Sequence, residues 1–377
     1  MGTATIAGQT LTVNQAGGSP DTTPPFGSFD TPIDNTNNVV GAIGVTGWAL
    51  DNVGVTKVEV YRDAVTGEAT GNFGFVFIGT TVFVTGARPD VQSLYPNYPN
   101  ANRAGWGYQL LTNFLPNRGN GTFKLHAIAY DAAGNTVEIG TGKTIICTNN
   151  SAAKPFGTID TPAQGETISG SGYINFGWAL TPGASFMIPI NGSTITVVVD
   201  GVILGSPTYN NFRSDIASLF PGYTNSRGGV GFFFLDTTKL TNGVHAISWN
   251  VYDNANRAEG LGSRYFTVAN GGTANVPAEE EPPLDLPQTL PLDENGVYSM
   301  DAEEMEHIEL HTGATAGHSL VNGAIEALPV GSTLKRGVFY WQLGPGFLGE
   351  HRLVLIRPDG QQVEVRVRIR PKTFAPL

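Results

Sequence analysis

The sequence contains two copies of one long pattern, and this duplication constrains the fold more than any other feature. The first copy includes FGSFDTP and GWALDN, and the second includes FGTIDTP and GWALTP. Phe26 and Trp48 recur as Phe156 and Trp178 with the same separation. A later block, NGTFKLHAIAYDAAGN, recurs as NGVHAISWNVYDNANR. Because whole blocks recur in the same order, the chain holds two copies of one domain.

Each copy reads as short strands separated by turns. Residues 56–61 alternate, which places Val58 and Val60 on one face of a strand. The 49 glycines, 24 prolines and only 14% of charged residues are typical of many turns and not of long charged helices. We therefore predict an all-β chain of three tandem immunoglobulin-like β-sandwich domains, the first two homologous. Trp48 is the predicted buried tryptophan of the first copy.

The predicted boundaries divide the chain into seven parts. They are an orphan β-hairpin at 1–18 that belongs to an upstream domain, a linker at 19–25, the first repeat at 26–148, a linker at 149–155, the second repeat at 156–268, an acidic proline-rich linker at 269–288 and a C-terminal immunoglobulin-like domain at 289–372. In the last part, residues 363–369 alternate strictly, with valines and an isoleucine inward. Short or proline-bearing linkers limit hinge freedom, so we expect an extended row of sandwiches.

Three phrases resemble bacterial immunoglobulin-like domains. TIAGQTLTVNQ resembles the closing hairpin of BACON-type domains, and AYDAAGNTVEIG resembles the penultimate turn of many bacterial immunoglobulin-like domains. ALPVGSTLKRGVFYWQLGPGFLGEHRLVLIRPDG resembles the immunoglobulin-like domains of bacterial surface proteins. These resemblances imply tandem immunoglobulin-like domains of a secreted or cell-surface protein, in an accessory role.

Charge and composition limit the partners. The formal net charge is −11 and no basic stripe is visible, which argues against nucleic acid. No apolar run is long enough to span a bilayer. Cys147 is the only cysteine, so an intrachain disulfide is impossible. We expect an extracellular or cell-surface location and no cofactor.

One block is the strongest candidate for a ligand site, and it occurs in both copies. Its residues are Arg88, Asp90, Tyr95, Tyr98 and Trp106 in the first copy and Arg213, Asp215, Phe220 and Tyr223 in the second, where Val230 takes the place of Trp106. In a functional interpretation, the charged pair binds a ligand and the aromatic rings stack on sugars. In a structural interpretation, each aspartate N-caps a helical turn and the rings pack the loop against its own sandwich. Capping chemistry alone accounts for the spacing, which favours the structural interpretation.

Metal and catalytic patterns are weaker still. His307, Glu309 and His311 share one face of a predicted strand, with His318 nearby, while Asp51, Asp131 and Asp253 lie at turns where calcium is conceivable but turn capping explains them better. We therefore predict no metal site. The sequence has no Gly-x-Ser-x-Gly elbow, phosphate-binding loop or HExxH motif, so we also predict no enzymatic activity.

The sequence favours a non-catalytic extracellular structural or interaction module of a larger bacterial secreted or surface protein. The first alternative is a carbohydrate-binding accessory region of a secreted hydrolase, whose partner would be a polysaccharide. The second is a self-assembling surface protein, in which the N-terminal hairpin adds to a sheet edge of another chain. Another surface protein is also a conceivable partner.

Overall fold

The structure is a computed structural model that describes residues 2–6, 9–13, 20–271 and 291–374. It is almost entirely β. Its α-helices are the short segments α1 (Pro89–Leu94), α2 (Pro116–Gly119) and α3 (Ser214–Leu219). No helix in these ranges combines the length and apolar character needed to cross a bilayer. The predicted N-terminal hairpin is present as β1 (Gly2–Ile6) and β2 (Gln9–Val13), which pair with each other.

The first copy folds as two facing sheets. One sheet has the order β3-β5-β9-β8, formed by Phe26–Thr31, Ala42–Leu50, Gly105–Leu111 and Val82–Phe83. The other has the order β4-β12-β10-β6-β7, formed by Thr36–Val39, Lys143–Thr148, Asn120–Asp131, Val55–Arg62 and Val76–Thr80, with β11 (Thr136–Glu138) beside β10. In chain order these are strands A-B-E-D against G-F-C with an added strand at each edge, β4 and β7, which is the immunoglobulin-like arrangement.

The second copy repeats this topology. One sheet has the order β13-β15-β19-β18, formed by Phe156–Ile159, Tyr173–Leu180, Val230–Leu235 and Thr208–Asn211. The facing sheet has the order β14-β21-β20-β16-β17, formed by Thr167–Ile168, Ala258–Val268, Gly243–Tyr252, Ile195–Val199 and Val202–Gly205. The homology of the two copies therefore extends from their sequences to their strand order.

A third sandwich follows with a different sequence. Its larger sheet has the order β22-β29-β28-β24-β25, formed by Val297–Glu303, Gln362–Arg370, Gly349–Ile356, Ala316–Val321 and Ala324–Glu326. The smaller sheet has the order β23-β27-β26, formed by His307–Ala314, Gly337–Gln342 and Ser332–Lys335. The alternation predicted for 363–369 is confirmed, because Val363, Val365, Val367 and Ile369 are all buried. The all-β fold of three immunoglobulin-like sandwiches is thus as predicted.

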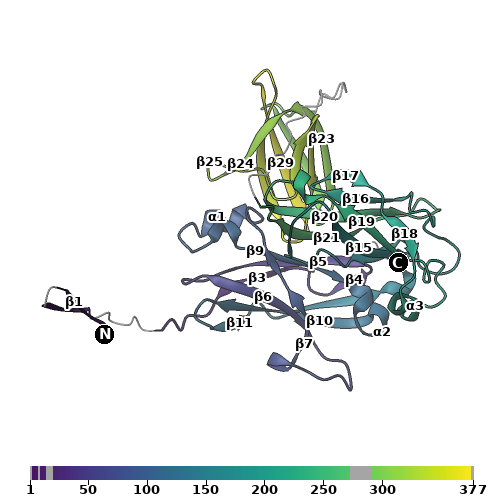
Figure 1. The fold of residues 1–377 in the computed structure, drawn as a ribbon, viewed down its shortest axis with the longest axis horizontal. Helices are drawn as coiled ribbons and strands as arrows, with labels where there is room; N and C mark the ends of the chain where they lie inside the picture. Colours follow the sequence, from purple (N-terminus) through teal and green to yellow (C-terminus); the bar gives the residue numbers. More distant parts are fainter. Residues whose placement is uncertain (1, 7–8, 14–19, 272–290, 375–377) are drawn as a thin grey trace.

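The three sandwiches do not form the extended row that we expected. Figure 1 shows the third sandwich, in yellow-green, packed on the first two. One hydrophobic cluster contains Val84 and Ala87 of the first sandwich, Ala246 and Tyr265 of the second, and Trp341 and Phe347 of the third. The expectation of a row considered only the linkers, whereas the faces of the sandwiches themselves bury apolar side chains against one another.

The prediction that Trp48 is the buried core tryptophan of the first copy is wrong. Trp48 is only partly buried and packs against Phe26 and Tyr95, while Trp106 on the neighbouring strand is 0% exposed. Trp178, the counterpart of Trp48, is fully buried. Phe114 of the first sandwich lies edge-on to the Trp178 ring, at a centroid distance of 5.8 Å. Trp178 is therefore buried partly by a side chain of the first sandwich.

The strand pairing also corrects the alignment of the two copies. Trp106 pairs with Gly47, whereas Gly177, the counterpart of Gly47, pairs with Gly231. The counterpart of Trp106 is therefore Gly231 and not Val230. In the second copy, Trp249 from the facing sheet occupies the space, since a Cβ on Gly177 would lie 2.9 Å from the Trp249 ring.

Candidate functional site

The arginine of the repeated block is held by two carboxylates in each copy. Arg88 donates from Nε to Asp90 Oδ1 at 2.9 Å and from Nη2 to Asp90 Oδ2 at 2.7 Å, and its Nη1 also contacts Asp30. Burial raises the pKa of Asp90, but the hydrogen bonds from Arg88 outweigh it and hold the carboxyl below its usual pKa. Arg88 is therefore committed to joining α1 to the end of β3.

The second copy builds the same ion pairs. Arg213 donates from Nε to Asp215 at 2.8 Å and also contacts Asp160. The predicted helical turns are present, but neither aspartate is the N-cap. Arg88 and Arg213 occupy that position. Each aspartate lies inside the first turn of its helix, where its carboxylate accepts a hydrogen bond from the arginine. The aspartates thus follow charge pairing and not capping.

The aromatic residues of the block pack against one another. In the first copy, Tyr95 and Tyr98 make edge contacts with Phe26 at centroid distances of 5.4 and 5.2 Å. In the second copy, Phe220 and Tyr223 lie 5.0 and 5.9 Å from Phe156.

These contacts leave little ring surface for a ligand. Trp106 and Phe220 are 0% and 2% exposed, so neither ring face is accessible. Tyr98, at 37% exposed, keeps an open edge. Trp106 belongs to the main core of the first sandwich. Tyr95 in the first copy, and Phe220 and Tyr223 in the second, belong to two smaller clusters, one in each copy.

A cleft that the sequence did not indicate lies between the first and second sandwiches. Its volume is about 510 Å³, within the usual range for small-ligand sites. Its lining includes Phe77, Tyr108, Gln109, Phe114, Gln164 and Arg264. Gln109 and Gln164 join the two sandwiches beside the cleft, because the backbone N–H of Gln109 donates to Gln164 Oε1 at 3.0 Å. Residues from both copies are needed to form this cleft.

Arg264 on β21 is the most unusual residue of the cleft. It is 8% exposed, and it donates from Nη1 to Pro162 O at 3.2 Å and from Nη2 to Thr158 Oγ1 at 2.9 Å. Its Nε has no hydrogen-bond partner, and it makes no ion pair within the described ranges. Burial lowers the pKa of Arg264 to about 10, so it remains a cation at neutral pH. It is a buried donor facing a cleft.

Two exposed phenylalanines border the same cleft. Phe77 on β7 is 53% exposed and Phe114 is 52% exposed. Aromatic rings beside polar donors suit a ligand with both apolar faces and hydroxyl groups, which describes a sugar. The cleft therefore combines aromatic stacking surface with a buried cation.

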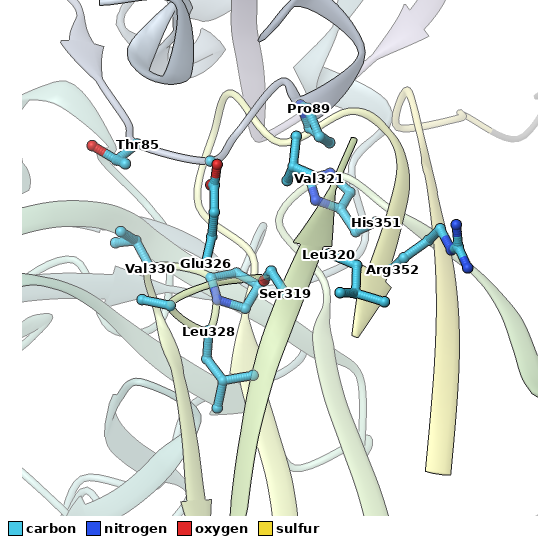
Figure 2. A pocket seen from close by; sticks show the side chains of 13 residues that line it. Thr85, Pro89, Ser319, Leu320, Val321, Glu326, Leu328, Val330, His351 and Arg352 are labelled. Carbon is cyan, nitrogen blue, oxygen red and sulfur yellow. The ribbon is translucent and has the colours of Figure 1, made fainter. Parts of the chain in front are cut away.

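A second cavity, between the α1 loop and the third sandwich, is much smaller. Figure 2 shows Glu326 and His351 on its wall, together with Val321 and Leu328. Its volume is about 120 Å³, below the range of small-molecule sites. Gln92 donates from Nε2 to Glu326 at 2.6 Å and so links α1 to β25. Burial lowers the pKa of His351 to about 4, which keeps the imidazole neutral. The cavity is part of an interface.

A buried carboxyl lies where the three sandwiches meet. Glu304, which is 3% exposed, accepts hydrogen bonds on Oε1 from the hydroxyls of Thr31 at 2.9 Å and Thr46 at 3.1 Å. The Lys372 amide donates to its other oxygen at 3.4 Å. Burial raises the pKa of Glu304 to about 7. No sequence pattern marks this residue, because the two hydroxyl groups that bond it lie in another sandwich.

The residues considered for metal binding are partly brought together. His307, Glu309 and His311 do lie on one face of β23, with His311 Nε2 at 2.9 Å from Glu309. His318 lies on β24, in the opposite sheet. Asp253 is paired with Arg257, whereas Asp51 and Asp131 converge with Asp21, a residue that the sequence analysis placed in a linker.

Comparisons with known proteins add only distant likenesses. No protein-family model and no curated protein matches the chain. The chain is similar to the fibronectin(III)-like modules of Clostridium thermocellum CbhA, with 15% identity and a TM-score of 0.20 over 65% of this chain and 95% of that chain. It is similar to the Bacteroides ovatus protein SGBP-B solved with a mixed-linkage heptasaccharide, with 9% identity and a TM-score of 0.20 over 93% of this chain and 71% of that chain. The D00-D0 domain of intimin shares 12% identity, with a TM-score of 0.20, over 64% of this chain and all of that domain. These TM-scores are low, and the immunoglobulin-like class rests on the strand order.

Proposed function

We propose that this chain is a non-catalytic extracellular module that holds flanking parts of a larger protein in a fixed arrangement. The observation that supports this function most is the junction of the three sandwiches. Hydrogen bonds between buried polar groups join the third sandwich to the other two, as between Glu304 and Thr31 and between Ser263 and Leu343. Such contacts fix orientation, because each depends on groups from two separate domains.

The backbones at the junction approach too closely to allow sliding. A Cβ on Gly107 of the first sandwich would lie 2.1 Å from the carbonyl oxygen of Pro345 in the third. A Cβ on Gly344 of the third would lie 2.3 Å from the Tyr265 ring of the second. Ser263 of the second sandwich donates to the Leu343 carbonyl oxygen at 3.1 Å. These contacts argue for one rigid unit and not for three hinged domains.

Solution scattering on the whole chain tests this rigidity. We expect the wild-type chain to give a single compact profile, and Gly107→Ala to raise the radius of gyration because the added methyl cannot fit against Pro345. Gly172→Ala is the matched control, because a Cβ there meets nothing within 4 Å. A wild-type profile typical of independently moving domains, or an unchanged radius in Gly107→Ala, would refute the rigid-unit function. Turnover of polysaccharide, peptide or ester substrates by the purified chain would refute the non-catalytic part.

Carbohydrate binding is the second candidate, and the cleft between the first two sandwiches favours it. Phe77 and Phe114 offer exposed rings beside the buried cation of Arg264. This placement differs from the sequence-based alternative of sugar binding, in which the stacking residues are Tyr95, Tyr98, Trp106, Phe220 and Tyr223.

A glycan array followed by titration calorimetry separates the two functions. If a glycan binds in the cleft, Phe114→Ala and Phe77→Ala each weaken it by about 1 kcal/mol or more, whereas Phe234→Ala, an equally exposed ring that does not line the cleft, leaves it unchanged. Binding that survives both cleft substitutions would place the glycan elsewhere. The absence of any bound glycan would leave the rigid-unit function alone.

Self-assembly through the N-terminal hairpin is the remaining alternative. Strands β1 and β2 pair with each other in the described residues, which leaves two free strand edges. Light scattering with and without residues 1–18 tests this directly. A mass that falls on deletion would support assembly, and an unchanged monomer mass would remove it.

A further inference from the structure

Three carboxylates of the first sandwich converge from distant segments. Asp21 precedes β3, Asp51 follows β5, and Asp131 ends β10. One carboxylate oxygen of each residue lies within 4.8 Å of the corresponding oxygens of the other two. Asp51 is 1% exposed and Asp131 is 4% exposed, so two of the three charges are buried.

The partners of these carboxylates are all neutral. Asp51 Oδ1 accepts from the Val53 amide at 2.7 Å, and Asp131 accepts from the Asn135 amide at 2.8 Å and from its side chain at 2.7 Å. In the described part of the chain, no lysine, arginine or histidine forms an ion pair with any member of the cluster.

Two of the oxygens also lack any hydrogen bond. Asp51 Oδ2 and Asp21 Oδ2 are inaccessible to solvent and have no partner in the described residues. A buried carboxylate oxygen without a donor is unfavourable, and three adjacent negative charges increase the cost. A cation bound between the carboxylates would offset these charges and supply the missing partners.

The second sandwich solves the same problem with a side chain. Thr181 follows GWAL where Asp51 does in the first copy, and Ser151 precedes Phe156 by the same interval as Asp21 precedes Phe26. The surviving carboxylate, Asp253, receives Arg257 Nε at 2.7 Å. Asn135 takes the place of Arg257 in the first copy. One copy therefore carries a built-in cation, and the other carries three carboxylates and none.

We propose that Asp21, Asp51 and Asp131 bind a calcium ion that fastens residues 20–25 to the first sandwich. Two oxygens on one calcium ion, each at 2.3–2.6 Å, can lie up to about 5.2 Å apart, and the observed limit of 4.8 Å falls within this distance. All three ligands are hard oxygens, which suit calcium, and backbone oxygens or water complete its six to eight ligands. Zinc prefers nitrogen and sulfur ligands, and magnesium retains most of its water.

Calorimetric titration of the whole chain, after removal of divalent ions with EDTA, tests the assignment. We expect one calcium ion per chain, a clearly weaker response to magnesium, and a melting temperature that rises by several degrees in calcium. Asp21→Asn and Asp51→Asn each weaken calcium binding at least tenfold. Asp21 is the safer substitution because it lies outside the core strands. Asp51→Asn without calcium melts no lower than the wild type, since it removes an unpaired buried charge.

Asp253→Asn is the matched control, because its carboxylate occupies the same turn in the second copy but is already paired with Arg257. It leaves calcium binding unchanged. Several results overturn the proposal: no saturable binding of calcium, binding unaffected by Asp21→Asn and Asp51→Asn, loss of binding in Asp253→Asn, or an equal response to magnesium.

Discussion

Replacing Glu304 with glutamine tests the most consequential single residue at the junction. Its carboxyl is buried between the first and third sandwiches and accepts hydroxyl hydrogen bonds from Thr31 and Thr46. Its pKa is raised to about 7. Burial is the largest cause, the negative charge of Asp30 adds a smaller rise, and the hydrogen bonds from the threonine hydroxyls lower the pKa in part. The Tyr265 hydroxyl also lies nearby without a hydrogen bond.

The magnitude follows from the two protonation equilibria. In the unfolded chain this glutamate releases its proton near its ordinary pKa of 4.5, whereas in the folded chain it releases it near 7. Between these values the folded state binds more protons, so stability falls as pH rises through this window. The loss is complete above about pH 7 and amounts to about 3 kcal/mol, at about 1.4 kcal/mol for each pH unit. Below pH 4.5 the group contributes no such loss.

Urea denaturation of the wild-type and Glu304→Gln chains at pH 4.5 and pH 8 measures this effect. Glutamine stays neutral, so we expect the variant to gain up to about 3 kcal/mol over the wild type between the two pH values. Glu350→Gln, an exposed residue of the same sandwich, is the control and shows little change. A gain below about 1 kcal/mol for Glu304→Gln would refute the reasoning. It would mean that the carboxyl is hydrated at the junction.

Three further predictions rest on single contacts. Arg88→Ala lowers the free energy of unfolding by about 2 kcal/mol, because the Arg88 side chain that holds Asp30 and Asp90 is only 10% exposed, whereas Arg213→Ala, whose side chain is 34% exposed, costs about 1 kcal/mol; chemical denaturation ranks the two. Cys147 reacts with a thiol reagent only on unfolding, because burial raises its pKa to about 12, and rapid labelling of the folded chain would contradict this. Trp106→Ala costs about 4 kcal/mol, and adding Ala127→Trp restores part of it; calorimetric melting of the single and double variants decides this.

The fold was accessible from the sequence because its signals are local. The alternation of residues 363–369 indicates a strand with one buried face, and the structure buries all four apolar side chains. The duplicated blocks needed no long-range information either, since both copies carry the same turns in the same order. Such patterns reflect the two-residue repeat of a strand, which any window of a few residues reveals.

The junction and the cleft were not accessible in the same way. Glu304 stands in the short acidic stretch DAEEME, and nothing there distinguishes it from its exposed neighbours. Its burial depends on Thr31 and Thr46, which belong to another domain. Arg264 likewise belongs to a stretch with the pattern of an ordinary strand, so nothing in the sequence indicates that it lines a cleft. Predicting these sites requires knowing how whole sandwiches pack.

The calcium cluster is an intermediate case, because its sequence signal appears only when the two copies are compared. Asp51 and Asp131 occur at turns, and Asp21 lies in a stretch with the composition of a linker. A comparison of the copies shows more. The second copy lacks the counterparts of Asp21 and Asp51, and it alone carries an arginine, Arg257, beside the remaining aspartate.

The exchange of Trp106 for Trp249 follows the same logic. A tryptophan is lost from one sheet, and the facing sheet supplies another to fill the space beside the conserved position of Gly47 and Gly177. In a close-packed core such a loss must be compensated nearby, because the cavity would otherwise cost several kcal/mol. The buried charge cluster obeys the same constraint in electrostatic terms. Positions at which two copies of a domain differ in a correlated way therefore identify groups that share one physical requirement. By this criterion the buried carboxylates of both copies need a nearby positive charge. Arg257 supplies it in the second copy, and a bound calcium ion supplies it in the first.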